Sequence, residues 1–459
     1  MNKSVLGIDL GTSSVKILQI FQDHSKLKFK EEYKEKNRKG WWDAILSIFD
    51  EINFDTVEAI GLSSQVGTYL INQDKIIHWN QPEGKEQLER ILKKYEKETF
   101  LKELGLNHPK LNSYPIPRLL YCSEAFSDVK YICQPKDYIC EMLTGKRVSD
   151  PYSWRGLAEK ESMEYSAYFL EEIKIKKNQL PEIKSFDKVA GYTKEIDLKN
   201  NKVRPGIPVY TGLNDFFASL AGMGITDEKT LFDITGTSEH LGIITKTYES
   251  STGLIASPYL ENYIHYGVTA SAGDSIKMAL RLGMEKLDLE KEYPLKSPIF
   301  LPYLNGERAP IFDPDARGCF FGIGQEAEKL FPYSVLEGIV FSLYHIYENL
   351  GMPPMERILL SGGAGDLKFL NELKAEIFGV RVEILEETET SALGAALIAA
   401  VGSGWYPDLK EAQKDRCKRK SIIKPGYGWK GKLESRYEIY KKLYPLLKEL
   451  YQEFKEKTK

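Results

Sequence analysis

The feature that most constrains the fold is an N-terminal hairpin at residues 5–20. Two apolar runs, 5–10 and 15–20, flank the small residues Gly11–Ser14, and each run is typical of a buried strand. Asp9 places a charge in the first run that an apolar core rejects unless something compensates it. N–H groups at the tip of such a turn suit phosphate oxygens, and a carboxylate beside them suits hydrated Mg²⁺. The alternative is an ordinary hairpin whose aspartate caps the turn.

Length and composition indicate a globular protein of two domains. A chain of 459 residues is too long to fold around a single hydrophobic core of ordinary size, so we expect two domains, at 1–222 and 223–459. Hydrophobic residues make up 42% of the chain and charged residues 28%, which is typical of a folded soluble protein. A net charge of -3 gives no support for a nucleic-acid partner. No run approaches the roughly 20 apolar residues that span a bilayer, so we expect no membrane partner.

The cysteines indicate a reducing compartment. An odd number of widely spaced thiols without a CxxC pair argues against a disulfide scaffold or a zinc site. The N-terminus also lacks the charged-then-apolar pattern of a secretion signal, so we expect a cytoplasmic protein. The five cysteines are Cys122, Cys133, Cys140, Cys319 and Cys417.

Beyond the hairpin, strand-like and helix-like segments alternate. Apolar residues recur at helical spacing in 41–49, whereas 57–65 is typical of a strand that ends in a polar loop. Residues 135–143 form an amphipathic pattern with a proline at its start, which predicts another helix. This alternation predicts an α/β fold.

The second half of the chain repeats the pattern of the hairpin. Residues 230–234 predict a strand, Gly236–Ser238 a small polar turn, and 241–244 the returning strand. Gly-Thr-Ser stands in both turns, which we call the first turn (Gly11–Ser14) and the second turn (Gly236–Ser238). Chance is the alternative, because three residues are few. Both copies lie between two apolar runs, which favours a structural repeat.

Asp215 lies where a predicted strand meets a predicted helix. The strand covers 209–212, and the small residues 218–222 predict a helix. Ligand sites of open α/β sheets gather at the carboxyl ends of strands, which makes Asp215 a candidate functional residue. A cap at the N-terminus of the helix is the alternative.

Three segments complete the second half. Residues 357–361 predict a buried strand, and the glycine-rich loop 362–365 lets a backbone approach a flat ligand closely. The small-residue helix predicted from residue 390 could pack beside that loop. Residues 430–454 show a helical apolar stripe that predicts a helix docked on the core.

Taken together, these motifs resemble the FGGY carbohydrate kinases, most closely their xylulokinase-like branch. The resemblance covers nearly the whole chain and implies two RNase H-like domains of the actin, sugar kinase and heat-shock chaperone superfamily around a central cleft. It also implies transfer of the γ-phosphate of ATP to a hydroxyl of an open-chain sugar or polyol. The matching segments are 7–16, 135–138, 214–215, 300–310, 360–364 and 392–396.

The resemblance also implies roles for individual residues. Asp215 matches the catalytic base that takes the proton of the attacking hydroxyl, and Asp9 matches the carboxylate that holds Mg²⁺. The other matches bind ATP: Gly11, Thr12, Ser13 and Ser14 in the first turn, Gly236 and Thr237 in the second turn, Gly273 and Lys277 beside the nucleotide, and Gly363 and Ala364 at the adenosine.

The chain departs from the family pattern in the segments that bind the sugar. Val66 and Gly67 replace a Met-His pair after Gln65, and Phe216 stands where Asn or Gln is common. Trp79 is kept and could stack on a sugar face, but the Asp and Arg that follow it in the family are lost. Since each change removes a polar group, D-xylulose is the nearest expectation, and another ketose, a deoxysugar or a polyol is the alternative.

Two further hypotheses come from other functional classes. The departures in the sugar-binding segments allow a relative that binds a sugar or nucleotide without catalysis. The other hypothesis is an actin-like or chaperone-like ATPase, although the Gly306-Glu307-Arg308 block favours the kinases. The resemblance also implies that the chain could form a homodimer.

Overall fold

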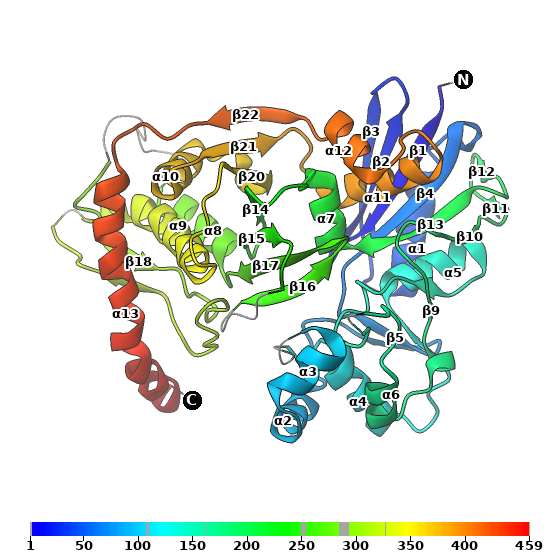
Figure 1. Ribbon diagram of the computed structural model, residues 1–459, viewed down its shortest axis with the longest axis horizontal. Coiled ribbons are helices and arrows are strands. Elements are labelled where there is room, and N and C mark those ends of the chain that lie inside the picture. The colour runs from blue at the N-terminus through cyan, green and yellow to red at the C-terminus, as the bar shows by residue number, and fades with distance from the viewer. Residues whose placement is uncertain are drawn as a thin grey trace. The chain divides into compact units, whose positions relative to one another are not determined.

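The computed structural model describes residues 2–106, 109, 111–159, 161–248, 254–283, 293–325 and 327–458. The chain forms two compact units. The first unit comprises Met1–Gly224 and Glu389–Cys417, and the second comprises Ile225–Thr388 and Lys418–Lys459. Figure 1 shows the labelled elements, coloured from the N-terminus in blue to the C-terminus in red.

The first unit is built on a six-stranded sheet of order β10-β13-β4-β1-β2-β3. β1, β2 and β3 form an antiparallel meander, while β4 and β13 run parallel to β1. The predicted N-terminal hairpin is thus confirmed as β1 and β2, with the first turn between them. The strands are β1 (Ser4–Leu10), β2 (Ser14–Phe21), β3 (Lys26–Glu32), β4 (Val57–Ser64), β10 (Val189–Tyr192) and β13 (Pro208–Asn214).

Helices of the first unit begin and end at local sequence signals. Asn37 caps α1 by accepting a hydrogen bond from the N–H of Gly40. α5 begins with a proline and a capping box of Gln134 and Asp137, and ends at Gly145 in the left-handed conformation. These helices and two others in this unit are α1 (Arg38–Phe49), α5 (Pro135–Thr144), α7 (Asp215–Met223) and α12 (Leu409–Arg416).

A smaller subdomain within the first unit has its own hydrophobic core. Figure 1 shows its helices α2, α3, α4 and α6 grouped around the short sheet that contains β5. Its elements are β5 (Tyr69–Ile71), β6 (Lys75–Ile77), β7 (Ile132–Cys133), α2 (Lys85–Lys94), α3 (Lys97–Leu104), α4 (Pro115–Ala125) and α6 (Ala167–Ile173). Short pairs add β8 (Val148–Ser149), β9 (Glu182–Ile183), β11 (Ile196–Asp197) and β12 (Lys202–Val203).

The second unit repeats the strand plan of the first. Its sheet has the order β16-β17-β15-β14-β20-β21-β22. β14 pairs antiparallel with β15 and parallel with β20, as β1 does with β2 and β4, and the outer strands also correspond in direction. The strands are β14 (Thr230–Thr235), β15 (His240–Thr245), β16 (Ile255–Tyr259), β17 (Asn262–Val268), β20 (Arg357–Gly362), β21 (Arg381–Leu385) and β22 (Arg419–Ile423).

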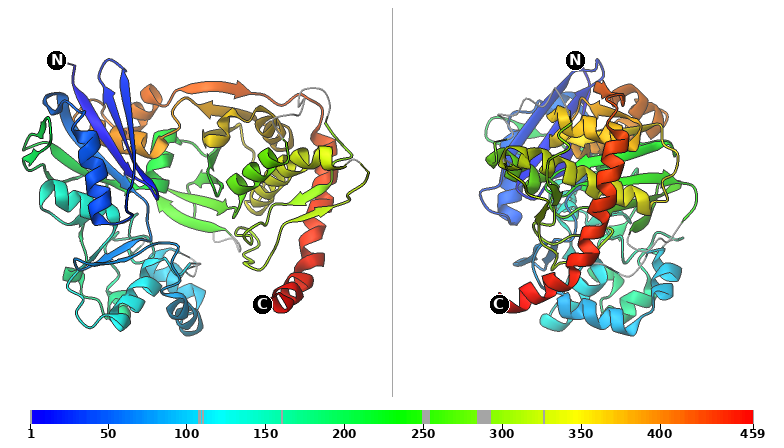
Figure 2. Two further views of the ribbon diagram at one scale, coloured as in Figure 1. Left: turned by 180° about the vertical axis from the view of Figure 1, so that it is seen from behind. Right: turned by 90° about the vertical axis from the view of Figure 1, so that its left-hand side faces the viewer.

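The core of the second unit lies between its sheet and its long helices. The predicted C-terminal helix is α13, which buries Leu433, Tyr437, Tyr440 and Leu443 in this core and is seen in red in Figure 2. Its predicted stripe is only partly buried, since Phe454 is exposed. The remaining elements are β18 (Ile299–Leu301), β19 (Cys319–Phe321), α8 (Ala272–Arg281), α9 (Phe331–Asn349), α10 (Lys368–Phe378) and α13 (Lys430–Lys457).

The small-residue helix α11 (Thr390–Gly402) belongs to the first unit, whereas the 362–365 loop belongs to the second, so the predicted packing between them stays a prediction. It contacts α7, β1 and β4. Added Cβ atoms at Gly7, Gly61 and Gly394 would each lie 1.9 Å from a backbone oxygen across this contact. Glycines therefore allow α11 to pack closely against α7, β1 and β4. The segment 389–417 belongs to the second half of the sequence but is part of the first unit.

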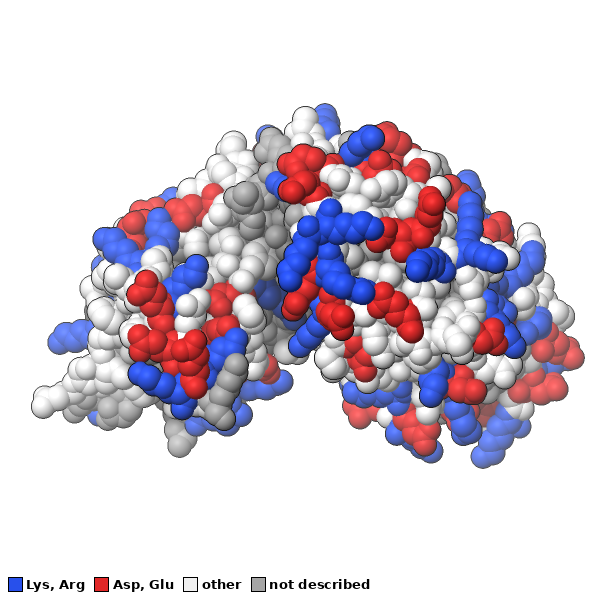
Figure 3. All heavy atoms as spheres, turned by 90° about the horizontal axis from the view of Figure 1, so that it is seen from below, with Lys and Arg blue, Asp and Glu red and all other residues white. Residues whose placement is uncertain are grey.

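On the face drawn in Figure 3, acidic and basic side chains are interspersed. Within the described ranges, none of the helices has the length and apolar character needed to cross a membrane.

Candidate active site

Asp9 lies near the carboxyl end of β1, beside β4. The register pairs Asp9 with Ser63, whose hydroxyl donates a 2.9 Å hydrogen bond to Asp9 Oδ1. Burial raises the pKa of Asp9 to about 6, although Lys16 and the bond from Ser63 lower it and Glu389 adds to the rise. Lys16 also pairs with Glu389 at 2.5 Å, so its charge is shared between carboxylates.

Asp215 is the first residue of α7 and follows β13 directly. The helix cap is Asn214, whose side-chain oxygen accepts a 3.0 Å hydrogen bond from the N–H of Phe217. The capping alternative for Asp215 is therefore wrong by one residue. Burial raises the pKa of Asp215 to about 7, and the neighbouring charge of Asp9 contributes to the rise.

Parallel pairing brings the two carboxylates to the same edge of the sheet. β1 and β13 both run parallel to β4, which lies between them. Ser63 of β4 is opposite Asp9 on one side and opposite Leu213 on the other. Asp9 and Asp215 thus lie at the carboxyl ends of these strands, where open α/β sheets collect ligands.

The first turn adjoins the segment that the sequence predicts to bind the sugar. Thr12 and Ser13 are exposed, and the N–H of Gly11 donates to the carbonyl of Ser14 at 3.0 Å. The Thr12 hydroxyl donates to Gln65 Oε1 at 3.2 Å. The structure therefore brings the first turn and Gln65 together.

Val66 and Gly67 lie on the loop between β4 and β5, Trp79 lies on the loop after β6, and hydrogen bonds hold both loops in place. Gly67 has a φ of +80° and donates its N–H to Gln134 Oε1 at 3.3 Å, while Trp79 N donates to Thr68 Oγ1 at 3.2 Å. Val66 and Trp79 are 36% and 37% exposed, so their apolar surfaces remain accessible.

Phe216 follows Asp215 and is half-buried. Its ring lies edge-on to Phe217, with 5.3 Å between the ring centroids. The residue after Asp215 therefore brings an aromatic ring, and no hydrogen-bonding side chain, to this end of α7.

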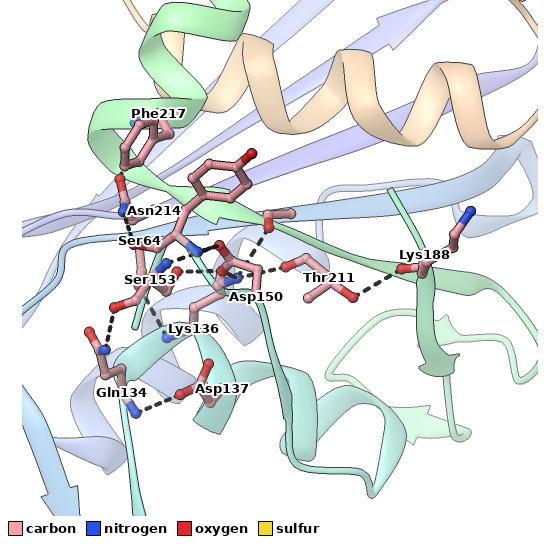
Figure 4. A network of polar contacts seen from close by, with 12 residues as sticks. Ser64, Gln134, Lys136, Asp137, Asp150, Ser153, Lys188, Thr211, Asn214 and Phe217 are labelled. Atoms are coloured by element: carbon pink, nitrogen blue, oxygen red, sulfur yellow. Dashed lines mark hydrogen bonds and ion pairs between the residues drawn. The ribbon is translucent and has the colours of Figure 1, made fainter. Parts of the chain in front are cut away.

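Sequence reasoning missed a buried ion pair between Lys136 and Asp150 in the first unit. Figure 4 shows Lys136 reaching from the start of α5 toward Asp150 and the end of β13. Lys136 Nζ also donates to the carbonyls of Thr211 at 2.9 Å and Gly212 at 3.3 Å. The Pro-Lys-Asp-Tyr motif marked Lys136 in the sequence, but only the fold shows that Asp150 is its partner.

The second turn forms the corresponding feature of the second unit. Gly236 and Thr237 are exposed, and the N–H of Gly273 donates to the carbonyl of Thr237 at 3.0 Å. A Cβ at Gly273 would lie 2.5 Å from the carbonyl oxygen of Gly236, so α8 can begin against the turn only with glycine. Lys277 is exposed and pairs with Asp274 at 3.1 Å.

Arg308 is a second residue that sequence reasoning left without a role. Its guanidinium donates to Ser238 Oγ at 3.2 Å and thus places a positive charge beside the second turn. The Gly-Glu-Arg block at 306–308 marked Arg308 in the sequence. Its contact with Ser238 could not be predicted, because the two residues are far apart along the chain.

Gly363 and Ala364 are held against the strand that precedes the second turn. The N–H of Ala364 donates to Thr235 Oγ1 at 3.0 Å. Gly362 has a φ of +101°, and a Cβ there would lie 2.2 Å from the carbonyl oxygen of Thr235. The glycine-rich loop is therefore in direct contact with the end of β14.

A buried lysine braces both strands that flank the second turn. Lys374 Nζ lies 2.6 Å from Asp233 on β14 and 2.6 Å from Glu239 after the turn. All three side chains are buried, and burial together with Asp233 raises the pKa of Glu239. Lys374 thus fixes the base of the turn.

Two sheets share one strand plan, and each has a buried carboxylate on the strand that precedes an exposed turn of small residues. This arrangement is typical of the actin-like fold of sugar kinases. Models of the FGGY family of carbohydrate kinases match the chain, with the N-terminal domain at residues 4–222 and the C-terminal domain at 232–403. The chain therefore belongs to the FGGY family of carbohydrate kinases, and the predicted family and fold class are confirmed. It is a phosphotransferase of the xylulose kinase-like group.

Individual relatives are similar over almost the full chain. A xylulose kinase from Staphylococcus epidermidis is 28% identical, covering 97% of both chains, and a glycerol kinase from Aquifex aeolicus is 27% identical, covering 90% of this chain and 92% of the relative. Among solved structures, a gluconate kinase from Lactobacillus acidophilus superposes with a TM-score of 0.86 at 24% identity, covering 99% of this chain and 100% of that one. Because the sequence identity to that structure is low, the superposition is evidence for the fold alone.

Proposed function

We propose that the protein transfers the γ-phosphate of ATP to a hydroxyl of an open-chain sugar, with a ketose such as D-xylulose as the nearest acceptor. The observation that carries the proposal is the position of Asp215 at the carboxyl end of β13, beside Asp9, with its pKa raised to about 7. A general base works best when its pKa lies near the working pH.

Asp215 is the proposed base. Its carboxylate accepts the proton of the acceptor hydroxyl while that oxygen forms a bond to the γ-phosphorus. The bond between the γ-phosphorus and the bridging oxygen breaks, and ADP leaves with the electron pair. Phosphoryl transfer needs positioning and charge neutralisation more than covalent chemistry, so a positioned base is the main reactive group that the protein has to supply.

Asp9 is the residue proposed to hold Mg²⁺. Burial raises the pKa of Asp9, and burial together with the charge of Asp9 raises the pKa of Asp215, so negative charge there is incompletely compensated. A hard cation with oxygen ligands fits such a carboxylate. Mg²⁺, when bound, neutralises charge on the phosphates.

The two turns are proposed to bind the phosphates of ATP. Both expose small residues whose backbone N–H groups suit phosphate oxygens. Arg308, through its contact with Ser238, would add a positive charge to the second turn. Gly363 and Ala364, in contact with β14, are proposed to line the adenosine, with Gly273 and Lys277 beside the nucleotide.

The acceptor is proposed to lie against Gln65, Val66, Gly67, Trp79 and Phe216. Gln65 supplies a polar group joined to the first turn, whereas Val66 and Trp79 supply exposed apolar surface. A less hydroxylated acceptor suits this mixture, so another ketose, a deoxysugar or a polyol is the alternative. Relatives named xylulose, glycerol and gluconate kinase define the range of acceptors to test.

A panel of acceptors tests the proposal. ADP release is measured with ATP, Mg²⁺ and D-xylulose, D-ribulose, glycerol or D-gluconate, and a reaction without acceptor is the control. We expect acceptor-dependent turnover, highest with a ketose. Retained ATP binding without turnover on the panel would favour a non-catalytic sensor, and hydrolysis that no acceptor changes would favour an ATPase.

We place this reaction in the cytoplasm, where ATP is supplied and thiols stay reduced. None of the five cysteines, all of which lie in the described part of the chain, forms a disulfide, which is compatible with that compartment. A homodimer remains a prediction from the family, and light scattering after size-exclusion chromatography measures it.

A further inference from the structure

The strand that leads to Asp215 contains a β-bulge. β13 pairs in register with β4 at Val209 and Tyr210, and again at Leu213 and Asn214, but the register shifts in between. From Tyr210 to Leu213 the chain advances three residues while β4 advances two, so β13 carries one extra residue. Bulges bend a strand and re-aim the side chains that follow them.

Gly212 makes this bulge possible. Its φ is +68°, and a Cβ there would lie 1.8 Å from the carbonyl oxygen of Leu62. Only glycine fits that conformation and that gap. The bulge is therefore built into the chain three residues before Asp215.

Lys136 binds the carbonyls at the bulge. Its ammonium donates to the carbonyls of Thr211 and Gly212 and to the Asp150 carboxylate. These three acceptors match the three protons of an ammonium group. The side chains of Lys136 and Asp150 are 2% and 0% exposed, so no water competes for these bonds.

Asp150 ties the same network to the residue before Asp215. Its Oδ1 accepts the N–H groups of Tyr152 and Ser153, each at 2.9 Å. The carbonyl of Tyr152 in turn accepts a 2.9 Å hydrogen bond from Asn214 Nδ2. Figure 4 shows Lys136 from α5, and Asp150 and Ser153 from the segment after β8, close to the end of β13.

We propose that Lys136 is a positioning residue, which caps the bulge in β13 and thereby fixes the place of Asp215, with Asp150 as its counter-charge. The inference rests on the proposed role of Asp215 as the base. Without the ammonium, two buried carbonyls lose their partner, and the bulge relaxes to regain hydrogen bonds. Small displacements of a base are costly, since about 1 Å can reduce a rate on the order of 100-fold.

The competing explanation is that Lys136 merely neutralises a buried carboxylate. Lys136→Met alone leaves Asp150 charged and unpaired, which threatens folding. The double variant Lys136→Met/Asp150→Asn removes both charges, and the amide oxygen still accepts the N–H groups of Tyr152 and Ser153. It therefore separates neutralisation from capping of the bulge.

The test measures kcat, KM for ATP, the pH profile and Tm of the double variant with the best acceptor of D-xylulose, D-ribulose, glycerol and D-gluconate. We expect a Tm close to that of the unchanged protein, an unchanged KM for ATP and a kcat lower by roughly 10- to 100-fold. The acid limb of the kcat/KM profile should move to lower pH, since a displaced Asp215 is less buried.

Arg204→Met is the matched control. Arg204 also caps two backbone carbonyls in the first unit, those of Phe54 at 3.3 Å and Val57 at 2.7 Å, but at the start of β4. Its kcat should stay within about twofold, whereas a loss equal to that of the double variant would assign the effect to general loosening.

Two further outcomes would overturn the inference. If Asp215→Asn loses activity while the double variant keeps its kcat and pH profile, Lys136 only neutralises Asp150, and the proposed function stands. If Asp215→Asn keeps full activity, the proposed base is wrong, and the positioning role falls with it.

Discussion

The contact between α7 and α11 allows only glycine at its closest point. A Cβ added at Gly394 would lie 1.9 Å from the carbonyl oxygen of Ala218 and 3.0 Å from the nitrogen of Gly222. Ordinary van der Waals contact begins near 3.4 Å, so Gly394→Ala must part the helices by roughly 1.5 Å (3.4 less 1.9). Backbone atoms cannot swing aside as the end of a flexible side chain can.

The cost of Gly394→Ala follows from two opposing effects. Overpacking a core costs about 1–3 kcal/mol, and a clash with backbone belongs at the upper end. Alanine returns up to about 1 kcal/mol because it favours the helix over glycine. A net loss of about 2 kcal/mol in the free energy of unfolding corresponds to a fall in Tm of roughly 4–8 °C for a unit of this size.

Thermal unfolding followed by circular dichroism measures this loss. Gly431→Ala is the matched control, since it lies in the first turn of α13 and an added Cβ there meets nothing within 4 Å. Its Tm should stay level or rise. A Tm for Gly394→Ala that also stays level or rises would refute the close packing of α11. Because α7 begins at Asp215, the Gly394→Ala variant should also lose kcat.

Three further predictions concern charge and the nucleotide. The proposed base, Asp215, must be ionised to accept a proton and has a pKa of about 7, so kcat/KM should fall about tenfold per pH unit below pH 7; an acid limb centred near pH 4 would contradict this. Lys374→Met removes the cation beside buried Asp233 and Glu239, and urea unfolding should show a loss of about 3–5 kcal/mol in the free energy of unfolding at pH 8. Because burial raises the pKa of Glu239, that loss should shrink as the pH falls and Glu239 is protonated; an equal loss at acid pH would refute this. Gly273→Ala, whose Cβ would meet the backbone of the exposed second turn and displace it, should raise KM for ATP several-fold; an unchanged KM would remove that turn from nucleotide binding.

Local features of the fold could be predicted from sequence alone. β1, the first turn and β2 are neighbours in the chain, so apolar runs around a small polar turn suffice to predict them. The same holds for β14, the second turn and β15. The strand plan shared by the two units then follows from their similar local patterns and from the family resemblance.

Long-range contacts could not be predicted, because a local sequence pattern does not indicate which distant segment packs against it. α11 is apolar on nearly every side, so no face of it indicates a neighbour, and it joins α7 across some 170 residues through Ser219 and Ser391. The bulge at Gly212 and its cap by Lys136 likewise arise only when β4, α5 and β13 meet. The cap of α7 was misplaced by one residue, which is within the ordinary uncertainty of helix ends.

The most direct test of the account is kcat of Asp215→Asn, measured on the acceptor with the highest turnover. The substitution keeps the shape of the side chain and removes its basicity, so we expect kcat to fall on the order of 10²–10⁴-fold with KM for ATP unchanged.

Thermal unfolding of the same variant separates loss of the base from loss of the fold. The raised pKa of Asp215 means that its charge costs stability as pH rises from about 4 toward 7, so Asp215→Asn should unfold at or above the Tm of the unchanged protein at pH 8. A folded Asp215→Asn variant with lowered kcat supports Asp215 as the base. An unchanged kcat in that variant would contradict the account.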